Sequence, residues 1–202
     1  MNVVRLYRPP DFADVYNICV KTGANGEDAT GQFSNDDLLP DIYVGPYVTL
    51  QPDLAFVVEK GYRVVGYIVA TADTRIFVDR YRDEWLPGFA AKYSLVEPSI
   101  SVEERMIRKG YNPESMLSAS LQDYPAHLHV DLLPEVQGHG LGRLLIQTVL
   151  DALRSRSAAG VQLGVGIENL KARAFYARLG FLPLPSDPSN YSILGISTRA
   201  TV

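Results

Sequence analysis

The chain has 202 residues, which is the usual size of one domain. Hydrophobic residues make up 47% of it and charged residues 21%, a balance that is typical of a folded domain and excludes disorder as its main state. The net charge of −4 provides no basic field to hold a phosphate backbone, so nucleic acid is not expected as a partner.

Cysteine usage and apolar runs indicate the compartment. Cys19 is the single cysteine, so no disulfide can form within the chain, and we expect it to be a buried core residue. The N-terminus lacks the apolar core of a signal peptide, and no run approaches the roughly 18 apolar residues that span a bilayer. We therefore expect a cytoplasmic protein without a membrane partner.

The first part of the chain predicts a strand, a helix and a long loop. Residues 2–7 alternate weakly in polarity and predict the strand, and Asp11 can cap the helix that follows. The apolar residues with helical spacing in that helix are Phe12, Val15, Tyr16, Cys19 and Val20. Residues 22–52 are rich in Gly, Asp, Asn and Tyr, so they predict a binding loop with one short helix after Ser34.

A β-hairpin and a helical insertion come next. Residues 54–59 and 62–74 are rich in β-forming residues and are joined by Lys60-Gly61, which is a tight-turn signal. Residues 77–124 predict helical pieces, one of them opened by a capping box that starts at Ser101. We expect this insertion to be a substrate wall, a lid or the surface of a homodimer.

Strands and helices alternate in the last part of the chain. The strand-like runs are residues 126–132, 161–167, 181–184 and 191–197. A helix follows each of the first two runs, and Asn169 and Gly180 are suited to begin and end the second helix. We therefore predict a single α/β domain over residues 1–202, with a mixed sheet of about seven strands, helices on both faces and the insertion between the third and fourth strands.

Residues 137–143, Gln-Gly-His-Gly-Leu-Gly-Arg, leave a strand and open a helix. The alternate glycines expose successive backbone N–H groups, and the helix N-terminus adds partial positive charge, so the turn is an anion cradle suited to a diphosphate. Arg143 can add a charged contact. The spacing excludes a P-loop, which needs Lys and Ser or Thr after the glycines, and a dinucleotide fingerprint, which needs Gly where Arg143 stands.

Two segments resemble a known family. Residues 132–143 resemble motif A of the GNAT superfamily of acetyl-CoA-dependent N-acetyltransferases, and residues 169–181 resemble its motif B, with Asn first and a Leu-Gly-Phe ending. The runs 16–30 and 124–134 are similar to stand-alone bacterial relatives of the acetyltransferase-like domain of O-GlcNAcases. This resemblance implies the GNAT fold, with acetyl-CoA as cosubstrate and no metal.

The resemblance also implies roles for individual residues. The main chain of Val130 and Leu132 would hold the thioester and the pantetheine arm, Asn169 would hold the arm from the other side, and Tyr176 would be the general acid that protonates the leaving thiolate. The other cofactor-binding positions that it implies are Gln137, Gly138, His139, Gly140, Leu141, Gly142, Arg143, Ala172 and Phe175.

The general base is not supplied by the resemblance. Some family members carry Glu on the strand before motif B, but the matching position here is Gly164, which cannot accept a proton. His127, His129 and Asp131 alternate on a predicted strand, so their side chains share one face. His129 or Asp131 can take the proton of an amine, directly or through a water, or the three residues form a hydrogen-bonded buried cluster.

Substrate contacts are predicted at His127 and at Asp28, which lies in an acidic, glycine-rich part of the early loop. The acceptor is expected to be a small-molecule or peptide amine. Two alternatives are a cofactor-binding interaction module with weak or no catalysis, and a metal-dependent hydrolase that uses the His-x-His-x-Asp run. The hydrolase is short of ligands, because the remaining histidine, His139, lies in the glycine turn.

Overall fold

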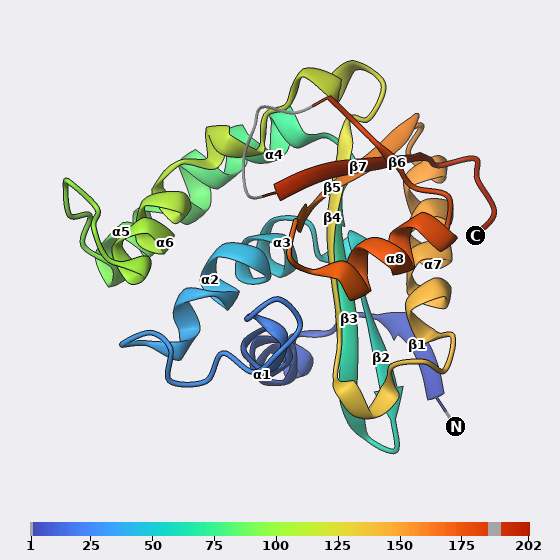
Figure 1. Cartoon of the computed structure of the whole chain (residues 1–202), viewed down its shortest axis with the longest axis horizontal. Helices are drawn as coiled ribbons and strands as arrows, with labels where there is room; N and C mark the ends of the chain where they lie inside the picture. Colours follow the sequence, from blue (N-terminus) through green and yellow to red (C-terminus); the bar gives the residue numbers. More distant parts are fainter. Residues whose placement is uncertain (1, 186–190) are drawn as a thin grey trace.

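The computed structural model describes residues 2–185 and 191–202, and its centre is a seven-stranded mixed sheet with the strand order β1-β2-β3-β4-β5-β7-β6 (Figure 1). Neighbouring strands are antiparallel except for β4 and β5, which are parallel. The strands are β1 (Asn2–Leu6), β2 (Ala55–Lys60), β3 (Arg63–Thr71), β4 (Ala126–Leu132), β5 (Gly160–Gly166), β6 (Leu182–Pro183) and β7 (Tyr191–Ser197). The predicted mixed α/β sheet is confirmed.

Helices cover both faces of this sheet (Figure 1). They are α1 (Phe12–Thr22), α2 (Pro40–Tyr43), α3 (Gly45–Leu50), α4 (Thr74–Arg80), α5 (Leu86–Lys92), α6 (Val102–Tyr111), α7 (Leu141–Ser155) and α8 (Leu170–Arg178). In β3, Ile68 faces the core cluster that contains α7, whereas Tyr67 and Val69 face the cluster that contains α1 and α3. Strand β3 is buried on both faces from Val64 onward, which is why its residues 64–70 form a continuous apolar run. No helix in the described part of the chain is both long and apolar enough to cross a membrane.

Helix α1 begins where predicted, but not through the predicted cap. The Asp11 carboxylate accepts hydrogen bonds from the Arg5 guanidinium at 2.7 and 2.8 Å and from the Arg8 backbone N–H at 2.8 Å, so it is not aimed at the helix. Four of the five expected apolar residues are buried, namely Val15, Tyr16, Cys19 and Val20, whereas Phe12 is 41% exposed. Cys19 is buried, as predicted.

The early loop contains more helix than the sequence predicts. A 3-10 turn (Asp36–Leu38) follows Ser34, but α2 and α3 come after it, each with proline in its first turn, at Pro40 and Pro46. Helices of 4 and 6 residues are too short to reveal a periodicity, so the remaining signal is proline within the first turn.

The hairpin forms as predicted, with Gly61 and Tyr62 at φ +54° and +70°. Strand β3 ends at Thr71 rather than at residue 74, because Asp73 begins α4 by accepting hydrogen bonds from the first backbone N–H groups of that helix. The capping box at Ser101 forms and opens α6. Helices α4, α5 and α6 form an arm that extends to the left of the sheet in Figure 1.

Candidate functional site

The two parallel strands diverge and open the sheet. Strand β4 pairs with β5 only at Ala126 and His127, although β4 continues beside β3 and β5 beside β7 to their ends. A cavity of about 1360 Å³ lies at this opening, bordered by the glycine turn, α8, the early loop and the insertion. It is large enough for an extended cofactor and a second ligand.

The glycine turn forms one end of the cavity. Gly138 and Gly140 have φ of +79° and +78°, a left-handed backbone that favours glycine, and no heavy atom lies within 4 Å of where a Cβ would stand on either. The Gln137 side-chain amide donates to the carbonyl of Leu132 at 2.8 Å and fixes the turn to the end of β4. At Gly142 a Cβ would come within 2.9 Å of the Phe175 ring, so this glycine lets α7 approach α8.

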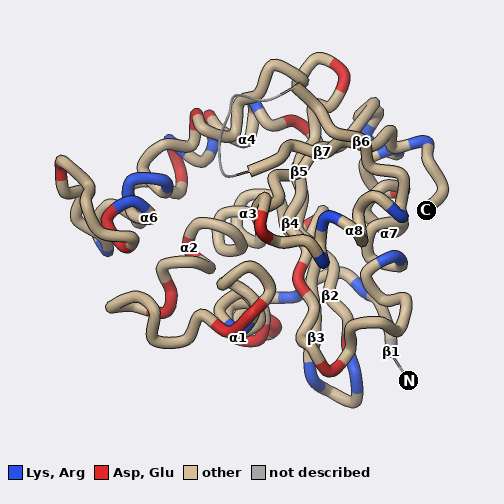
Figure 2. Tube along the Cα trace, in the orientation of Figure 1, with Lys and Arg blue, Asp and Glu red and all other residues tan. Residues whose placement is uncertain are grey.

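Basic side chains border the same end. Arg143, Lys171 and Arg178 line the cavity, together with Glu27, whose carboxylate lies 3.7 Å from the Lys171 ammonium. Figure 2 shows basic residues on α8, the helix beside this end of the cavity. The excess of positive charge beside the helix N-terminus favours an anionic ligand.

Helix α8 brings two of the predicted residues to the opposite wall. The Asn169 side-chain oxygen accepts from the Ala172 backbone N–H at 3.0 Å, so it caps α8 and leaves the side-chain amide NH₂ for another contact. The Tyr176 ring lies between Phe175 and Phe181, with centroids 5.2 Å from each, and it lines the cavity. Burial raises the pKa of Tyr176, so its phenol stays protonated at neutral pH.

The side chains of His127, His129 and Asp131 share one face of β4 and line the cavity, as the alternation predicts. Leu128 points to the opposite face and is buried in the core with α7. The Tyr67 hydroxyl donates to the Asp131 carboxylate at 2.6 Å. Burial raises the pKa of Asp131, and the hydrogen bond from Tyr67 opposes that rise.

Hydrogen bonds connect the two histidines through a tyrosine of α3. Thr74 Oγ1 lies 2.8 Å from His127 Nδ1, His127 Nε2 lies 2.7 Å from the Tyr47 hydroxyl, and that hydroxyl lies 3.1 Å from His129 Nε2. Burial lowers the pKa of both histidines to about 3, so both rings are neutral at pH 7. Each ring therefore carries one N–H and one nitrogen lone pair.

This chain of hydrogen bonds determines the tautomers. The Thr74 hydroxyl donates to the carbonyl of Pro125 at 2.8 Å, so it must accept from His127 Nδ1–H. His127 Nε2 is then an acceptor of the hydrogen bond that the Tyr47 hydroxyl donates, and the Tyr47 oxygen in turn accepts from His129 Nε2–H. We therefore assign the free lone pair of His129 to Nδ1.

Comparison with known proteins identifies the family. A family model described as the acetyltransferase (GNAT) family matches residues 26–181. The chain belongs to this GNAT family. The solved structure of SsHAT is 42% identical to this chain and covers 98% of both chains with a TM-score of 0.94. Protein O-GlcNAcase of Rattus norvegicus is 26% identical over 200 residues, which are 96% of this chain and 22% of that protein.

Both resemblances seen in the sequence are thereby confirmed. The GNAT chain spans 22% of the length of the O-GlcNAcases that it matches. The PaiA N-acetyltransferase from Thermoplasma acidophilum, solved in complex with coenzyme A, shares the fold, with 13% identity, a TM-score of 0.56 and coverage of 98% of this chain and 99% of that one. Membership of the acetyltransferase (GNAT) family supports acetyl-CoA as the acetyl donor of this chain.

The arrangement of the histidines does not suit a metal hydrolase. Both ring nitrogens of His127 are engaged, by Thr74 and by Tyr47. Within residues 2–185 and 191–202, no three His, Cys, Asp or Glu side chains are grouped so that they could share a metal ion. The GNAT cavity therefore offers this alternative no donor set.

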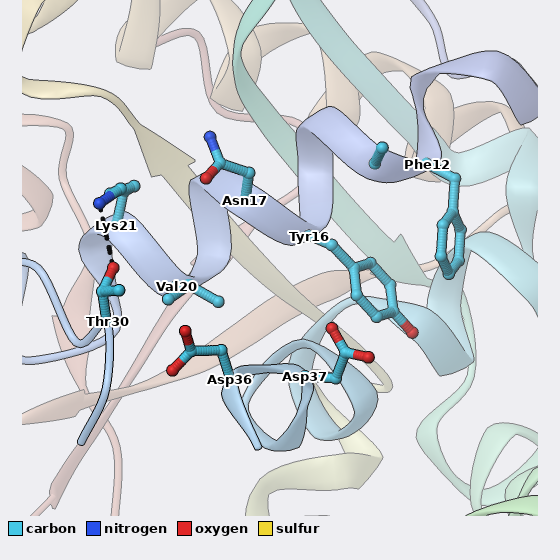
Figure 3. Close-up of a pocket in the computed structure, with 9 residues that line it drawn as sticks. Phe12, Tyr16, Asn17, Val20, Lys21, Thr30, Asp36 and Asp37 are labelled. Carbon is cyan, nitrogen blue, oxygen red and sulfur yellow. Dashed lines mark hydrogen bonds between the residues drawn. The ribbon is translucent and has the colours of Figure 1, made fainter. Parts of the chain in front are cut away.

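Asp28 is not brought together with the other predicted site residues. Its exposed carboxylate pairs with the Lys21 ammonium at 2.8 Å and accepts from the Thr30 backbone N–H at 2.8 Å, outside the lining of the GNAT cavity. Lys21 and Thr30 border a separate, smaller pocket of about 440 Å³ on the outer side of α1, where they bond to each other (Figure 3). The structure therefore does not place Asp28 with the other predicted site residues.

The exposed His139 and the buried Leu141 also lie outside the cavity lining. His139 Nδ1 lies 2.8 Å from the carbonyl of Gln137, and Leu141 is the first residue of α7. These two positions can therefore serve a ligand through the backbone of the turn, and their side chains support the turn itself. The sequence did not reveal Thr74, the first residue of α4, or Lys109, which lies in α6 of the insertion.

The neutral histidines make stability depend on pH. Their pKa is lowered to about 3 in the folded chain and is near 6.5 when the chain unfolds, so the unfolded state takes up protons as pH falls through this window. The free energy of unfolding should therefore fall below pH 6.5, by at most about 1.4 kcal/mol per pH unit for each histidine. Urea unfolding of wild type and His127→Asn at pH 5 and 7 tests this. An undiminished pH dependence in the variant would contradict it.

Proposed function

We propose that this GNAT chain transfers the acetyl group of acetyl-CoA directly to a primary amine. One observation carries the proposal: a single cavity collects the unpaired strand edges of β4 and β5, the protonated Tyr176 hydroxyl and the free Nδ1 of His129. Direct transfer needs a proton acceptor for the amine and a proton donor for the thiolate on the two sides of the reacting carbonyl.

The proposed reaction moves two protons. The ammonium of the acceptor loses a proton to His129 Nδ1, and the neutral nitrogen attacks the thioester carbonyl carbon. The C–N bond forms and the C–S bond breaks, and the Tyr176 hydroxyl protonates the departing sulfur. Backbone N–H groups at the diverging edge of β4, around Val130 and Leu132, would hold the carbonyl oxygen and the pantetheine arm.

The hydrogen-bond geometry favours His129 over Asp131 as the proton acceptor, although burial lowers the pKa of His129 and makes it a weak base. The Asp131 carboxylate is engaged by the Tyr67 hydroxyl at 2.6 Å, whereas His129 Nδ1 has no hydrogen-bond partner among the described residues. When Nδ1 takes a proton, the Tyr47 oxygen still accepts from Nε2–H, so the imidazolium keeps one of its hydrogen bonds.

Calorimetric titration with acetyl-CoA, followed by an assay of transfer to a panel of primary amines, tests the proposed function. We expect binding and transfer to at least one amine with release of one CoA per acetyl group. Binding without transfer to any amine would favour the alternative of a cofactor-binding module with weak or no catalysis. Failure to bind acetyl-CoA would contradict the proposal altogether.

A glycine substitution tests the diphosphate cradle. In Gly140→Ala, the new Cβ stands in the open space where we place the diphosphate, so the Kd for acetyl-CoA should rise about tenfold or more, which is about 1.4 kcal/mol. Gly31→Ala is a matched control, because Gly31 has φ +73° and equally open surroundings outside the cavity. Both variants should lose about 1 kcal/mol of folding stability, because alanine is strained at positive φ. Equal affinities of the two variants for acetyl-CoA would refute the diphosphate cradle.

A further inference from the structure

The insertion brings a lysine into the cavity beside the proposed base. Lys109 belongs to α6, and its ammonium lies 5.1 Å from the centre of the Tyr43 ring and 4.9 Å from the centre of the Tyr191 ring. The Tyr43 ring packs edge-on against His129, with centroids 5.3 Å apart. The ammonium and the base are therefore separated by one aromatic ring.

This lysine differs from its neighbours on the arm. Arg108 is exposed and pairs with Glu97, and Figure 2 shows basic residues along α6. Lys109 is half-buried among rings, and burial lowers the pKa of its ammonium. Among the described residues, no carboxylate forms an ion pair with it, so its charge is compensated only by the faces of the rings.

The other charged groups of the cavity lie elsewhere. Arg143, Lys171 and Arg178 border the glycine turn and α8, and Asp131 is engaged by Tyr67. Within the part of the chain that the structure describes, Lys109 is therefore the cationic residue that lines the other half of the cavity, which is bordered by the insertion and the early loop. A cationic group on the acceptor would meet repulsion there, whereas a single negative charge would compensate the ammonium.

We propose that the acceptor is an amine that also carries a carboxylate, and that Lys109 binds this carboxylate while the amine meets His129. This inference rests on the proposed amine transfer at the same site. A carboxylate fits better than a phosphate, because phosphate sites usually combine several donors with a helix N-terminus, and the described residues of this half of the cavity offer one ammonium.

Binding of the reaction products tests the proposal without requiring turnover. The probes are N-acetylated ω-amino acids, from N-acetylglycine to N-acetyl-6-aminohexanoate, and the primary amide of each. They are titrated by calorimetry into the protein saturated with CoA. We expect that for the best chain length the acid binds at least about tenfold more tightly than its amide, because only the acid compensates the charge of Lys109.

Two variants locate the preference. Lys109→Met should remove the preference for the acid and leave the affinity for acetyl-CoA unchanged, which also shows that the variant is folded. Arg105→Met removes a charge from the exposed side of the same helix and should keep the preference. Equal binding of acid and amide to the wild type, no binding of either, or a preference that survives in Lys109→Met would overturn the proposal.

The same compounds without the acetyl group separate this inference from the proposed function. Transfer to the acids, with a KM that rises in Lys109→Met while kcat for the amides is unchanged, supports both. A preference for acids in product binding without transfer to any free amine supports the role of Lys109 and contradicts the proposed transfer. Efficient transfer to the amides with no preference for acids contradicts the role of Lys109 alone.

Discussion

Replacing His129 by glutamine should lower kcat at pH 7 by about 10²- to 10⁴-fold, which is the usual contribution of a positioned general base. Glutamine suits this test because its side-chain NH₂ can replace His129 Nε2–H as the donor to the Tyr47 oxygen, 3.1 Å away. The hydrogen-bond chain is then kept, and only the lone pair of Nδ1 is lost. Steady-state rates with saturating acetyl-CoA measure the effect.

The pH profile separates loss of the base from damage to the cavity. In His129→Gln, the rate should rise steadily from pH 7 to pH 10, because a growing share of the amine arrives already neutral. The wild type should show a much weaker rise, because the lowered pKa keeps His129 in its basic form throughout this range. An unchanged kcat at pH 7, or a parallel loss of acetyl-CoA affinity, would remove His129 from the role of base.

The periodicity of β4 predicts its part of the site well. In a strand, alternate residues must share a face, so the placement of His127, His129 and Asp131 follows from local geometry alone. The glycine turn is equally local. Gly138 and Gly140 adopt positive φ, and glycine is the residue type that takes this backbone conformation without strain. These features did not require knowledge of the rest of the chain.

The hydrogen-bond chain from Thr74 to His129 could not be predicted from the sequence, for a physical reason. Tyr47 and His127 are 80 positions apart, and Thr74 and His127 are 53 apart, so their contacts depend on how three elements pack. Tyr47 lies in a helix of 6 residues without a readable period, and Thr74 lies where the sequence predicted the end of a strand. The tautomer of His129 depends on all of them.

The divergence of β4 and β5 illustrates the same limit. Both strands were predicted, but whether two parallel strands remain paired depends on the elements packed against them, and the pairing stops after two residue pairs. The capping box predicted α6 correctly, yet its sequence does not say that Lys109 turns toward the cavity. Which side of α6 faces the cavity is known only from the folded structure.

Replacing Tyr176 by phenylalanine should lower kcat by about 10²- to 10⁴-fold and leave acetyl-CoA binding nearly unchanged. Phenylalanine keeps the ring between Phe175 and Phe181, so packing is retained and only the hydroxyl is lost. The thiolate must then leave without a proton, which raises the barrier of the step that breaks the C–S bond. Turnover and calorimetric Kd, measured on one preparation, separate chemistry from binding.

Tyr111→Phe is the matched control for this substitution. The Tyr111 hydroxyl donates to the carbonyl of Tyr93 at 2.7 Å, outside the cavity lining, so its loss should cost about 1 kcal/mol of stability and leave turnover unchanged. A fall in kcat for Tyr176→Phe alone therefore reports on proton donation rather than on a weakened fold. If Tyr176→Phe retains the wild-type kcat, the sulfur leaves by another route and Tyr176 serves only to pack α8 against the core.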